Sequence, residues 1–368
     1  MKYTKLKYIN QYKSESINPA KTPDIIFEMY SVPIYETGHP EYLRGDEISS
    51  NKTVVQKNDI LLCKINPRIN RVWVVSDESD KQNIASSEWI VIRNSEYNSE
   101  FLAWYFRTPK FQKLMTSEVT GIGGSLTRAQ PKCVAEYPVP VIDRKKQDKI
   151  VDVLNKCKFI IDSRQKELLE LDNLIKARFV ELFGDAVDNP MGWEKKQLQE
   201  IVTDDCTISY GIVQTGDDQE EGVPVFRPVD IVNRVPKLEE LKKTTEEISN
   251  KYKRTILKGR EMLITVRANI ADTCIVGDEF AGCNVGRGIV PIRTQEDIMV
   301  LEFLKYLMDS KHLNDDIKSK AKGITLIQLN MEDLREVELI IPPLEQQKSF
   351  VEFAKQVDKS KVAVLKRF

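Results

Sequence analysis

The sequence contains an internal repeat with a period of about 200 residues, and this repeat limits the possible folds more than any other feature. Short segments of the first half recur in the same order in the second half, at an offset that drifts between about 191 and 202 residues. The matched pairs are Lys5–Ile9 with Gln197–Ile201, Ser31–Tyr35 with Gly222–Phe226, Asp59–Leu62 with Glu261–Ile264, Ile90–Arg93 with Val290–Arg293, Phe101–Leu102 with Phe303–Leu304, Gly123–Leu126 with Gly323–Leu326, and Val139–Pro140 with Ile341–Pro342. We therefore expect two copies of one fold.

Each copy begins with a domain that mixes strands and helices. Short apolar runs predict strands at Ile60–Ile65, Val72–Val75, Trp89–Ile92, Met262–Val266 and Gly288–Ile292. One helix is expected in each copy, over residues 99–117 and 296–318, and each copy closes on a strand that ends in proline. Residues 1–143 and 190–342 are therefore predicted to form two similar α+β domains.

A long helix is predicted to follow each domain. Residues 144–183 contain no proline or glycine, and Gly184 supplies a stop signal. Apolar residues alternate spacings of four and three, which is the heptad pattern of a coiled coil. A helix lying on a globular core is the alternative, and it would show a broader apolar face. The seam comprises Ile150, Leu154, Cys157, Ile161, Leu168, Leu171, Ile175 and Leu182, with Arg164 and Arg178 in the remaining positions; after Pro343, Phe350, Ala354, Val357 and Val364 continue the pattern.

The order of these segments predicts the architecture. The first helix leads from one domain to the next, so the second helix must run back antiparallel to bury its seam on the first. We expect two similar domains separated by long antiparallel coiled-coil helices, related by a pseudo-twofold axis in the form of a dumb-bell. A helix of 40 residues is about 60 Å long, whereas residues 343–368 span only about 39 Å as a helix.

Composition excludes several classes of function. The net charge is −1, from 55 basic and 56 acidic residues, and no apolar run is long enough to span a membrane. The two histidines, His39 and His312, have no companion at metal-ligand or catalytic spacing, so no metal site is expected. The phosphate-binding pattern G-x-x-x-x-G-K-[ST] is absent, and six dispersed cysteines are typical of a reducing cytosol. We therefore expect a cytoplasmic binding protein rather than an enzyme.

Several segments resemble the specificity subunit of type I restriction–modification systems. They are Tyr137–Pro140 followed by Gln147, the helix end Lys176–Asp185, the pair Gly192–Trp193, and Leu339–Pro343 with Glu345–Gln347. The resemblance covers essentially the whole chain in the family's order, and the shortened second helix departs from it. It implies that 1–143 and 190–342 are target-recognition domains, that 144–185 is a long spacer helix, and that 343–368 is a shortened one.

The resemblance also implies a function and partners. In this family each recognition domain reads one half of a bipartite DNA site, and two unlike domains read an asymmetric site. The implied partners are double-stranded DNA, two methylation subunits docked on the helices, and restriction subunits. S-adenosylmethionine, ATP and Mg²⁺ are expected only in those partners, and no cofactor in this chain. Because the second helix is short, self-association through Leu168, Leu171 and Ile175 is a further expectation.

Candidate DNA contacts must be local, because residues 1–143 hold 18 basic and 17 acidic side chains. Lysine, arginine and asparagine suit phosphates and base edges. In the first domain the candidates are Lys64, Asn66, Arg68 and Arg71 after a strand, and Ser125, Thr127 and Arg128 in a glycine loop. In the second domain they are Lys251, Lys253, Arg254, Arg267, Asn269, Asn284, Arg287, Lys320 and Lys322. Basic residues and asparagine follow the same strand in both repeats, so 64–71 and 267–270 form the strongest pair; solvated charged loops are the alternative.

A coiled-coil adaptor without its own nucleic-acid specificity is the alternative function. It would explain the long helices, but not two unlike α+β domains with basic loops at matched positions. Salt-dependent binding to DNA distinguishes the two functions, because each phosphate contact steepens the fall of affinity with salt.

Overall fold

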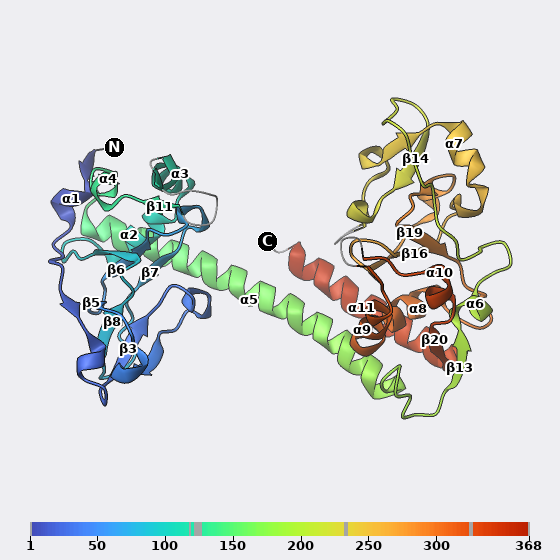
Figure 1. Ribbon diagram of the computed structural model, residues 1–368, viewed down its shortest axis with the longest axis horizontal. Helices are drawn as coiled ribbons and strands as arrows, with labels where there is room; N and C mark the ends of the chain where they lie inside the picture. Colours follow the sequence, from blue (N-terminus) through green and yellow to red (C-terminus); the bar gives the residue numbers. More distant parts are fainter. Residues whose placement is uncertain (1, 118, 121–126, 232–234, 324–326, 367–368) are drawn as a thin grey trace. The chain divides into compact units, whose positions relative to one another are not determined.

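The computed structural model describes residues 2–117, 119–120, 127–231, 235–323 and 327–366. The chain divides into two compact units, Met1–Ile161 and Asp162–Phe368 (Figure 1). The division falls inside the long helix α5 (Arg144–Phe183), so each unit includes one part of this helix. Both units combine helices with small sheets, which confirms the predicted α+β class.

The first unit is built from short strands and four helices that precede α5, within the residues described. The strands are β1 (Tyr3–Lys5), β2 (Ser16–Ile17), β3 (Ile26–Tyr30), β4 (Glu41–Arg44), β5 (Lys52–Val54), β6 (Ile60–Cys63), β7 (Val72–Val74), β8 (Gln82–Ala85), β9 (Trp89–Ile92), β10 (Val119–Thr120), β11 (Arg128–Ala129) and β12 (Pro138–Pro140). The helices are α1 (Leu6–Ile9), α2 (Ser99–Phe106), α3 (Pro109–Ser117) and α4 (Pro131–Val134). The strand orders are β2-β5-β8-β3-β4 and β7-β6-β9, with β1–β12 and β10–β11 as separate pairs.

The second unit has the same kinds of elements. The strands are β13 (Glu194–Gln197), β14 (Val223–Phe226), β15 (Lys242–Thr244), β16 (Met262–Thr265), β17 (Thr273–Ile275), β18 (Asn284–Val285), β19 (Ile289–Ile292) and β20 (Glu338–Ile341). The helices are α6 (Leu198–Ile201), α7 (Glu246–Lys251), α8 (Leu301–Met308), α9 (Lys311–Ser319), α10 (Met331–Arg335) and α11 (Leu344–Leu365). The strand orders are β15-β14-β18 and β17-β16-β19, with β13–β20 as a pair.

The two units repeat one topology, as the sequence repeat predicted. Strand β6 pairs antiparallel with β7 and β9, and β16 pairs in the same way with β17 and β19. Strand β3 is antiparallel to β4 and parallel to β8, and β14 has the same relation to β15 and β18. The pair β1–β12 corresponds to β13–β20. The predicted strands at β6, β7, β9, β16 and β19 are confirmed to within two residues at each end.

A buried ion pair is repeated at matched positions. Arg93 donates to the two carboxylate oxygens of Asp59 at 2.7 and 2.6 Å. Arg293 donates to Glu261 in the second unit. The side chains of both acids are 1% exposed, and each also accepts a backbone N–H. A buried carboxylate requires such partners, so these matched residues stabilise the two folds and are not available to a ligand.

The helices predicted over 99–117 and 296–318 are each broken in two, so their extent was predicted wrongly. The first break lies between α2 and α3, where Thr108 precedes Pro109 and the residue before a proline disfavours helical backbone. The hydroxyls of Thr108 and Ser310 each donate to the carbonyl three residues earlier, at 2.7 Å. This side-chain bond ends the first helix of each pair; in addition, α8 begins at Leu301 rather than at 296.

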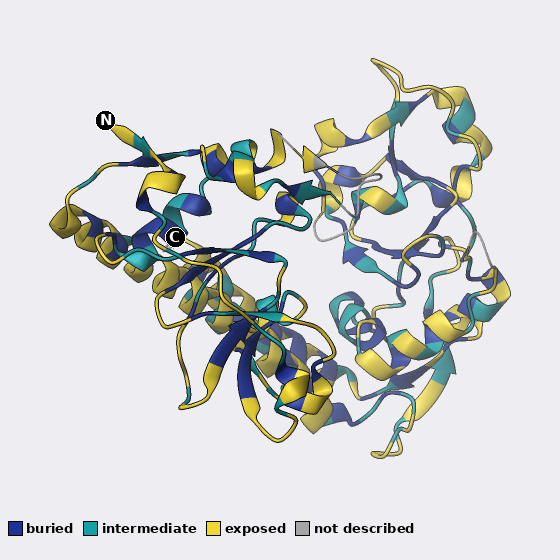
Figure 2. Ribbon diagram, turned by 60° about the vertical axis from the view of Figure 1, so that its left-hand side comes forward, coloured by how far each residue is buried: buried dark blue, intermediate teal, exposed yellow. Residues whose placement is uncertain are grey.

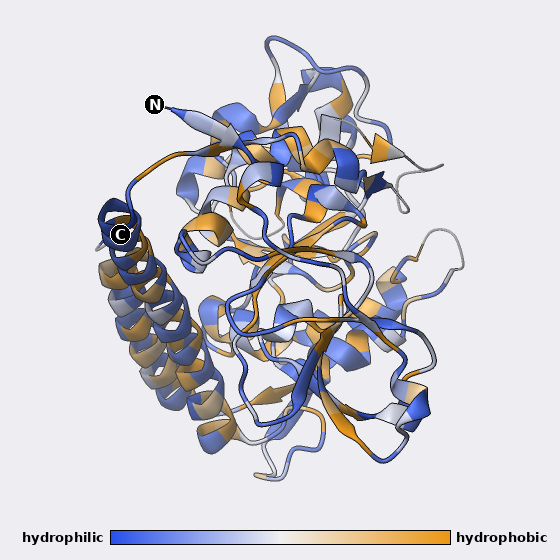
Figure 3. Ribbon diagram, turned by 90° about the vertical axis from the view of Figure 1, so that its left-hand side faces the viewer, coloured by the Kyte–Doolittle hydropathy of each residue, from blue (hydrophilic) through white to orange (hydrophobic). Residues whose placement is uncertain are grey.

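Within the second unit, α5 and α11 lie side by side and run antiparallel (Figures 1 and 3). The rings of Phe179 and Phe350 are 5.4 Å apart, and Lys361 contacts Asp172 at 2.5 Å. Residue numbers therefore rise along α11 while they fall along α5. The antiparallel helix pairing that the seam predicted is confirmed in this unit.

Apolar side chains gather beneath the helices of each unit. In the first unit the core includes Leu102, Phe106 and Phe111, all buried, and Trp73 and Trp89 lie in a second buried cluster. In the second unit the largest core joins α5, α8 and α11 to the sheet of β16 and β19. None of the helices within the described ranges is long and apolar enough to cross a membrane.

Candidate nucleic-acid interface

The predicted loop 64–71 connects β6 to β7 in the first unit. Asn66 and Asn70 have left-handed backbone conformations, with φ of 47° and 50°, which asparagine tolerates better than most residues. They enclose a single 3₁₀ turn, Pro67–Ile69. This turn leaves Arg68 exposed.

Among the residues that the structure describes, the same loop holds cations without an ion pair and polar atoms without a hydrogen bond. Among the described ion pairs, none involves Lys64, Arg68 or Arg71. Four nearby polar atoms are buried without a hydrogen-bond partner: Asn66 Oδ1, Asn70 Oδ1, Arg71 Nε and Gln112 Oε1. Each such atom costs about 1–3 kcal/mol. A loop with unpaired hydrogen-bond donors and acceptors is suited to a polar ligand.

The end of the predicted glycine loop lies against loop 64–71. The N–H of Asn66 donates to the carbonyl of Thr127, and the N–H of Ala129 donates to that of Lys64, both at 2.8 Å. Arg128 donates to both carboxylate oxygens of Glu88 at 3.2 Å, and this hydrogen-bonded carboxylate raises the pKa of Arg128. The structure thus brings Thr127 and Arg128 to the loop, with part of the Arg128 charge balanced. Ser125 lies outside the described residues.

The second unit repeats this arrangement with different side chains. The N–H of Leu329 donates to the carbonyl of Val266 at 3.0 Å, as Ala129 does to Lys64. Arg267 and Gln328 form a backbone bridge, as Ile65 and Arg128 do. Ala268 has a left-handed backbone with φ of 61°, at the position that Asn66 occupies in the first unit. The predicted pair 64–71 and 267–270 therefore occupies one place in one fold.

Sequence analysis did not identify Gln328 and Tyr210, which hold Arg267. Arg267 Nε donates to Gln328 Oε1 at 2.7 Å, and a terminal guanidinium N–H donates to the same oxygen. The amide of Gln328 donates to the Tyr210 hydroxyl at 2.5 Å. Asn269, on the same loop, is exposed. The repeat offset of 200 that matches Gly123 with Gly323 also places Gln328 opposite Arg128, and this signal could have identified it.

Three other candidates of the second unit lie near this loop or on its partner strand. Arg287 is exposed and precedes Gly288, whose carbonyl accepts the N–H of Val266 at 2.8 Å. Lys322 exchanges two backbone hydrogen bonds with Gln328, at 2.9 and 3.0 Å, and its side chain is exposed. Both lysines have an acidic partner, because the ammonium group of Lys320 lies 2.9 Å from the Asp316 carboxylate and that of Lys322 lies 3.8 Å from the Asp333 carboxylate.

Asn284 was a wrong candidate. Its side chain is fully buried, and its Oδ1 accepts a hydrogen bond from the Thr255 hydroxyl at 2.7 Å. Its amide donates to Ser249 Oγ at 3.0 Å and to the Ser249 carbonyl at 3.3 Å. These bonds tie β18 to α7 and leave no atom for DNA, so the asparagine stabilises the fold.

The basic segment 251–254 borders a hollow of about 450 Å³. The hollow is lined by Ser209, Tyr210, Asn250, Lys251, Tyr252, Lys253, Arg254 and Thr255. Lys251 pairs with Glu247 at 2.9 Å, whereas Lys253 and Arg254 are exposed and form no ion pair among the described residues. Because Tyr210 also bonds Gln328, this basic segment and the Arg267 loop belong to one polar surface.

Comparison with protein families gives a match in the second unit. Residues 190–367 match the model of the family described as the type I restriction modification DNA specificity domain. This part of the chain belongs to that family. The specificity domain so defined contains the Arg267 loop, the hollow at 251–254 and all of α11 that the structure describes.

Named specificity subunits resemble the chain beyond this domain. It is 22% identical over 291 residues to the EcoBI specificity subunit of Escherichia coli, which covers 73% of this chain but only 60% of that relative. It is also 22% identical over 376 residues to the MjaVIII specificity subunit of Methanocaldococcus jannaschii, covering 96% of this chain and 84% of that one. The resemblance inferred from the sequence is confirmed.

Solved structures share the fold. A chain from a study of complex assembly and conformational transition in a type I restriction–modification system has a TM-score of 0.55 and 21% identity, covering 100% of this chain and 92% of that one. The S subunit of the type I system of M. genitalium has a TM-score of 0.56 and 12% identity, covering 100% and 91%. At these identities the structural matches support the fold alone.

The predicted helix seam is only partly covered. On the part of α5 that lies beside α11, Ile175 is buried and Leu168 and Leu171 are partly buried. On α11 itself, the seam residues Phe350, Val357 and Val364 are buried. Ile175 is buried and Leu171 packs on the core of the second unit, so these two residues are not fully exposed as the sequence suggested; self-association through Leu168, Leu171 and Ile175 stays a prediction. Leu154 is partly buried, whereas Ile150 and Ile161 are exposed. Arg164 and Arg178 each pair with a glutamate three residues later on α5 itself.

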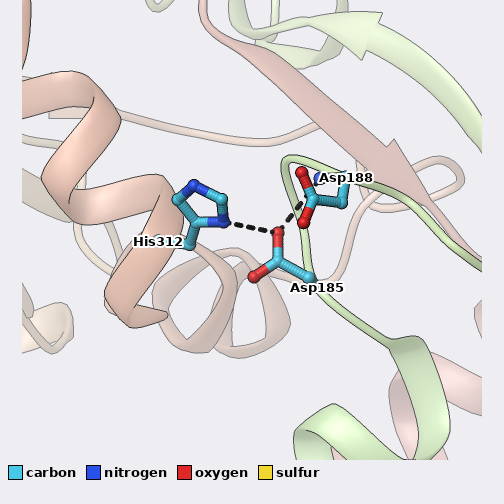
Figure 4. A group of neighbouring side chains, drawn as sticks. All are labelled: Asp185, Asp188 and His312. Atoms are coloured by element: carbon cyan, nitrogen blue, oxygen red, sulfur yellow. Dashed lines mark hydrogen bonds and ion pairs between the residues drawn. The ribbon is translucent and has the colours of Figure 1, made fainter.

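One group of side chains at the end of α5 has the composition of a metal site. Asp185, Asp188 and His312 offer ligand atoms within 4.8 Å of one another (Figure 4). Asp185 Oδ1 accepts the N–H groups of Val187 and Asp188 at 2.9 and 3.0 Å, and His312 Nδ1 lies 3.0 Å from it. Burial would raise the pKa of Asp185, but the N–H donors and His312 lower it below its usual value. Hydrogen bonds of a chain turn therefore account for this group.

Proposed function

We propose that this chain is the sequence-specific DNA-binding subunit of a type I restriction–modification system. In this proposal each unit reads one half of a bipartite, asymmetric site. The observation that carries it is the pair of loops that follow β6 and β16: one backbone frame, repeated in both units, presents unlike polar side chains. Base readout depends on side-chain identity, so two such loops suit two different half-sites.

The chemistry of each loop supports this role. The first offers Lys64, Arg68 and two asparagines, which suit guanine edges, phosphates and adenine edges. The second offers Arg267, held in place by Gln328, with Asn269 and Arg287 close in sequence to the same strands. A guanidinium held by a second side chain loses less rotamer freedom on binding. The adaptor alternative gives no role to these matched loops.

The proposal includes partners that perform the chemistry. Methylation subunits, two per assembly, would bind through the spacer helices and supply S-adenosylmethionine, and restriction subunits would supply ATP and Mg²⁺ chemistry. The chain itself would be non-catalytic, without a cofactor of its own, and cytoplasmic. The recognition domains, 1–143 and 190–342, would be its DNA-reading parts, and 144–185 and 343–368 its spacers.

The decisive experiment is to co-express the chain with its cognate methylation subunit and sequence the host DNA for modified adenine. We expect modification at one split, asymmetric motif. Arg68→Ala and Arg267→Ala are each expected to relax one half of that motif, by about 1–3 kcal/mol of discrimination, and to leave the other half unchanged. Each variant is therefore the control for the other.

Arg44→Ala provides a further control, because Arg44 is exposed on β4 and pairs with Asp24 at 2.9 Å. It should leave both halves of the motif unchanged. Modification that lacks a split motif, or identical changes in both variants, would contradict the assignment of one half-site to each unit. Complex formation with no DNA preference would favour the adaptor.

A further inference from the structure

The hollow at 251–254 lies beside the loop that carries Arg267 in the second unit. It has a volume of about 450 Å³, and its lining comes from two segments, Ser209–Tyr210 and Asn250–Thr255. The Tyr210 hydroxyl accepts a hydrogen bond from the amide N–H of Gln328 at 2.5 Å, and the amide oxygen of Gln328 holds Arg267. One side chain therefore connects the wall of the hollow to the guanidinium that the proposed function assigns to base readout.

The segment that lines this hollow forms a strand in the first unit. The N–H of Val55 donates to the Asn83 carbonyl at 3.1 Å, and the N–H of Leu257 donates to the Cys283 carbonyl at 2.8 Å, so Leu257 matches Val55. The residues just before Val55 form β5, which pairs with β2 and β8 in a sheet whose apolar side chains are buried (Figure 2). In the second unit, Lys253–Thr255 form a 3₁₀ turn instead, and this turn lines the hollow. The fold that the two units share therefore does not require the hollow.

The side chain of Tyr252, which lines the hollow, is available to a ligand. It is partly buried, but among the described residues its ring packs against no other aromatic ring and its hydroxyl forms no hydrogen bond. The backbone at Tyr252 is fixed, because its carbonyl accepts the Thr255 N–H and hydroxyl, both at 3.1 Å, and the buried Asn284 amide at 3.4 Å. An aromatic ring that is held in place and has no ring partner is suited to stacking on a base.

Other groups of the hollow suit a phosphate and the edge of a base. Lys253 and Arg254 are exposed and form no ion pair within the described ranges, whereas Lys251 is paired with Glu247. Ser209 Oγ is a buried hydroxyl without a hydrogen-bond partner among the described residues, and an unpaired buried group requires an explanation. An aromatic ring, two unpaired cations and an unpaired hydroxyl are groups that proteins use to bind nucleotides.

A tyrosine ring stacks only on a base whose face is free. In double-stranded DNA the neighbouring base pairs cover both faces, so a base must leave the stack before Tyr252 can contact its face. The volume of the hollow, about 450 Å³, lies within the range of about 300–1,000 Å³ that is typical of small-ligand sites. The hollow is therefore suited to one nucleotide rather than to a stretch of duplex.

We propose that the hollow at 251–254 binds one unstacked nucleotide of bound DNA, with the base against Tyr252 and the phosphate beside Lys253 and Arg254. The proposal rests on the proposed DNA-binding function and extends it, since readout in a groove requires only paired bases. Because the hollow is linked to Arg267, this nucleotide lies next to the half-site of the second unit. A free nucleotide carries the same chemical groups, so the experiment must separate the two sources.

Bulged DNA tests the site directly, because an unpaired base leaves the stack at the lowest cost. Fluorescein-labelled duplexes without the methylation motif carry either one extra deoxyadenosine or one abasic nucleotide at the same position. Both duplexes are titrated with the full chain at about 50 mM salt and followed by fluorescence anisotropy. We expect the deoxyadenosine bulge to bind about fivefold or more tightly than the abasic bulge, which has the same backbone but offers no base to stack.

Variants of the chain locate the bound base. Tyr252→Ala should lower the ratio of the two affinities to about one, whereas Tyr252→Phe keeps the ring and should retain the ratio. Lys253→Gln should weaken the binding of both duplexes and leave the ratio unchanged, because a phosphate contact does not depend on the base. Circular dichroism checks that Tyr252→Ala folds.

Equal affinity for the two bulges, or a preference that Tyr252→Ala leaves unchanged, would overturn the proposal. Deoxyadenosine monophosphate separates the two sources of the nucleotide. At about 1 mM it should not remove the preference, because it lacks the other contacts of bound DNA, and competition would assign the hollow to a free nucleotide instead. Each of these outcomes, with methylation of the split motif retained, would leave the DNA-binding function intact. A chain that binds no DNA would contradict both proposals.

Discussion

Arg128 and Gln328 occupy the same position in the two units and act differently on their surroundings. Arg128 is held by Glu88, whereas Gln328 holds Arg267 and is itself held by Tyr210. In the first unit the carboxylate of Glu88 balances part of the charge of Arg128. In the second unit the amide of Gln328 is neutral, so it does not balance the charge of Arg267. The second unit is thus the better placed to use a fixed arginine in base readout.

Replacing Gln328 should show whether base readout by the second unit depends on how Arg267 is held. We expect Gln328→Ala to lower the free energy of unfolding by about 1 kcal/mol, because hydrogen bonds to Arg267 and Tyr210 are lost. It should also relax the half-site of the second unit, because the guanidinium is no longer fixed. Denaturant unfolding and competition binding to variant DNA sites measure the two effects. Arg128→Ala is the matched control and should leave that half-site unchanged; equal effects of both variants would contradict the role of Gln328.

The cysteines should differ in reactivity according to burial. Burial raises the pKa of Cys274 to about 12 and that of Cys283 to about 11. At pH 8 only about one in ten thousand Cys274 thiols would then be ionised, and the thiolate is the reactive form. We expect Cys157, which is exposed, to react first with a maleimide in the folded protein. Mass spectrometry of a time course measures this, and rapid labelling of Cys274 would contradict the structure.

At the level of elements, periodicity and local signals predicted most of what the structure contains. The long helix was predicted over 144–183 because no breaker interrupts it, and α5 has these bounds. The break between α2 and α3 could have been predicted, because Pro109 is a local signal. The end of α8 could not, because the sequence does not show that the Ser310 hydroxyl donates to the Leu307 carbonyl. Asn284 was misassigned because its burial depends on a distant element, α7, whose Ser249 accepts a hydrogen bond from its amide. Gln328 and Tyr210 meet across 118 residues, which no local pattern reveals.

Matched positions on the two spacer helices should also differ in energy. Phe350 packs among Phe179, Phe183 and Phe303, so Phe350→Ala should create a cavity and cost about 3–5 kcal/mol of unfolding free energy. Ile150→Ala, at the equivalent position of α5, should cost less than about 1 kcal/mol, because the Ile150 side chain is 36% exposed. Denaturant unfolding followed by circular dichroism compares the two. Similar losses would show that residues 150–161 are covered in solution.

For the whole molecule, the net charge of −1 limits how the chain can attract DNA. A nearly neutral protein gains little from long-range attraction, so its affinity must come from a few local cations. Each cation that contacts a phosphate adds about 0.9 to the slope of log affinity against log salt. Lys253 and Arg254 are exposed and form no ion pair within the described ranges, whereas Lys251 is paired with Glu247. Replacing Lys253 and Arg254 should therefore change the salt slope of DNA binding more than replacing Lys251 does.

We expect the double variant Lys253→Gln with Arg254→Gln to lower that slope by about 1.8, and to weaken binding similarly for all DNA sequences, because phosphate contacts carry no sequence information. Lys251→Gln is the matched control in the same segment and should change the slope by less than about 0.5, since its charge is already balanced by Glu247. Anisotropy titrations of labelled duplex DNA between about 50 and 300 mM salt measure both. An unchanged slope in the double variant would place the hollow at 251–254 outside the DNA-binding surface. A change confined to one DNA sequence would instead assign these two cations to base readout.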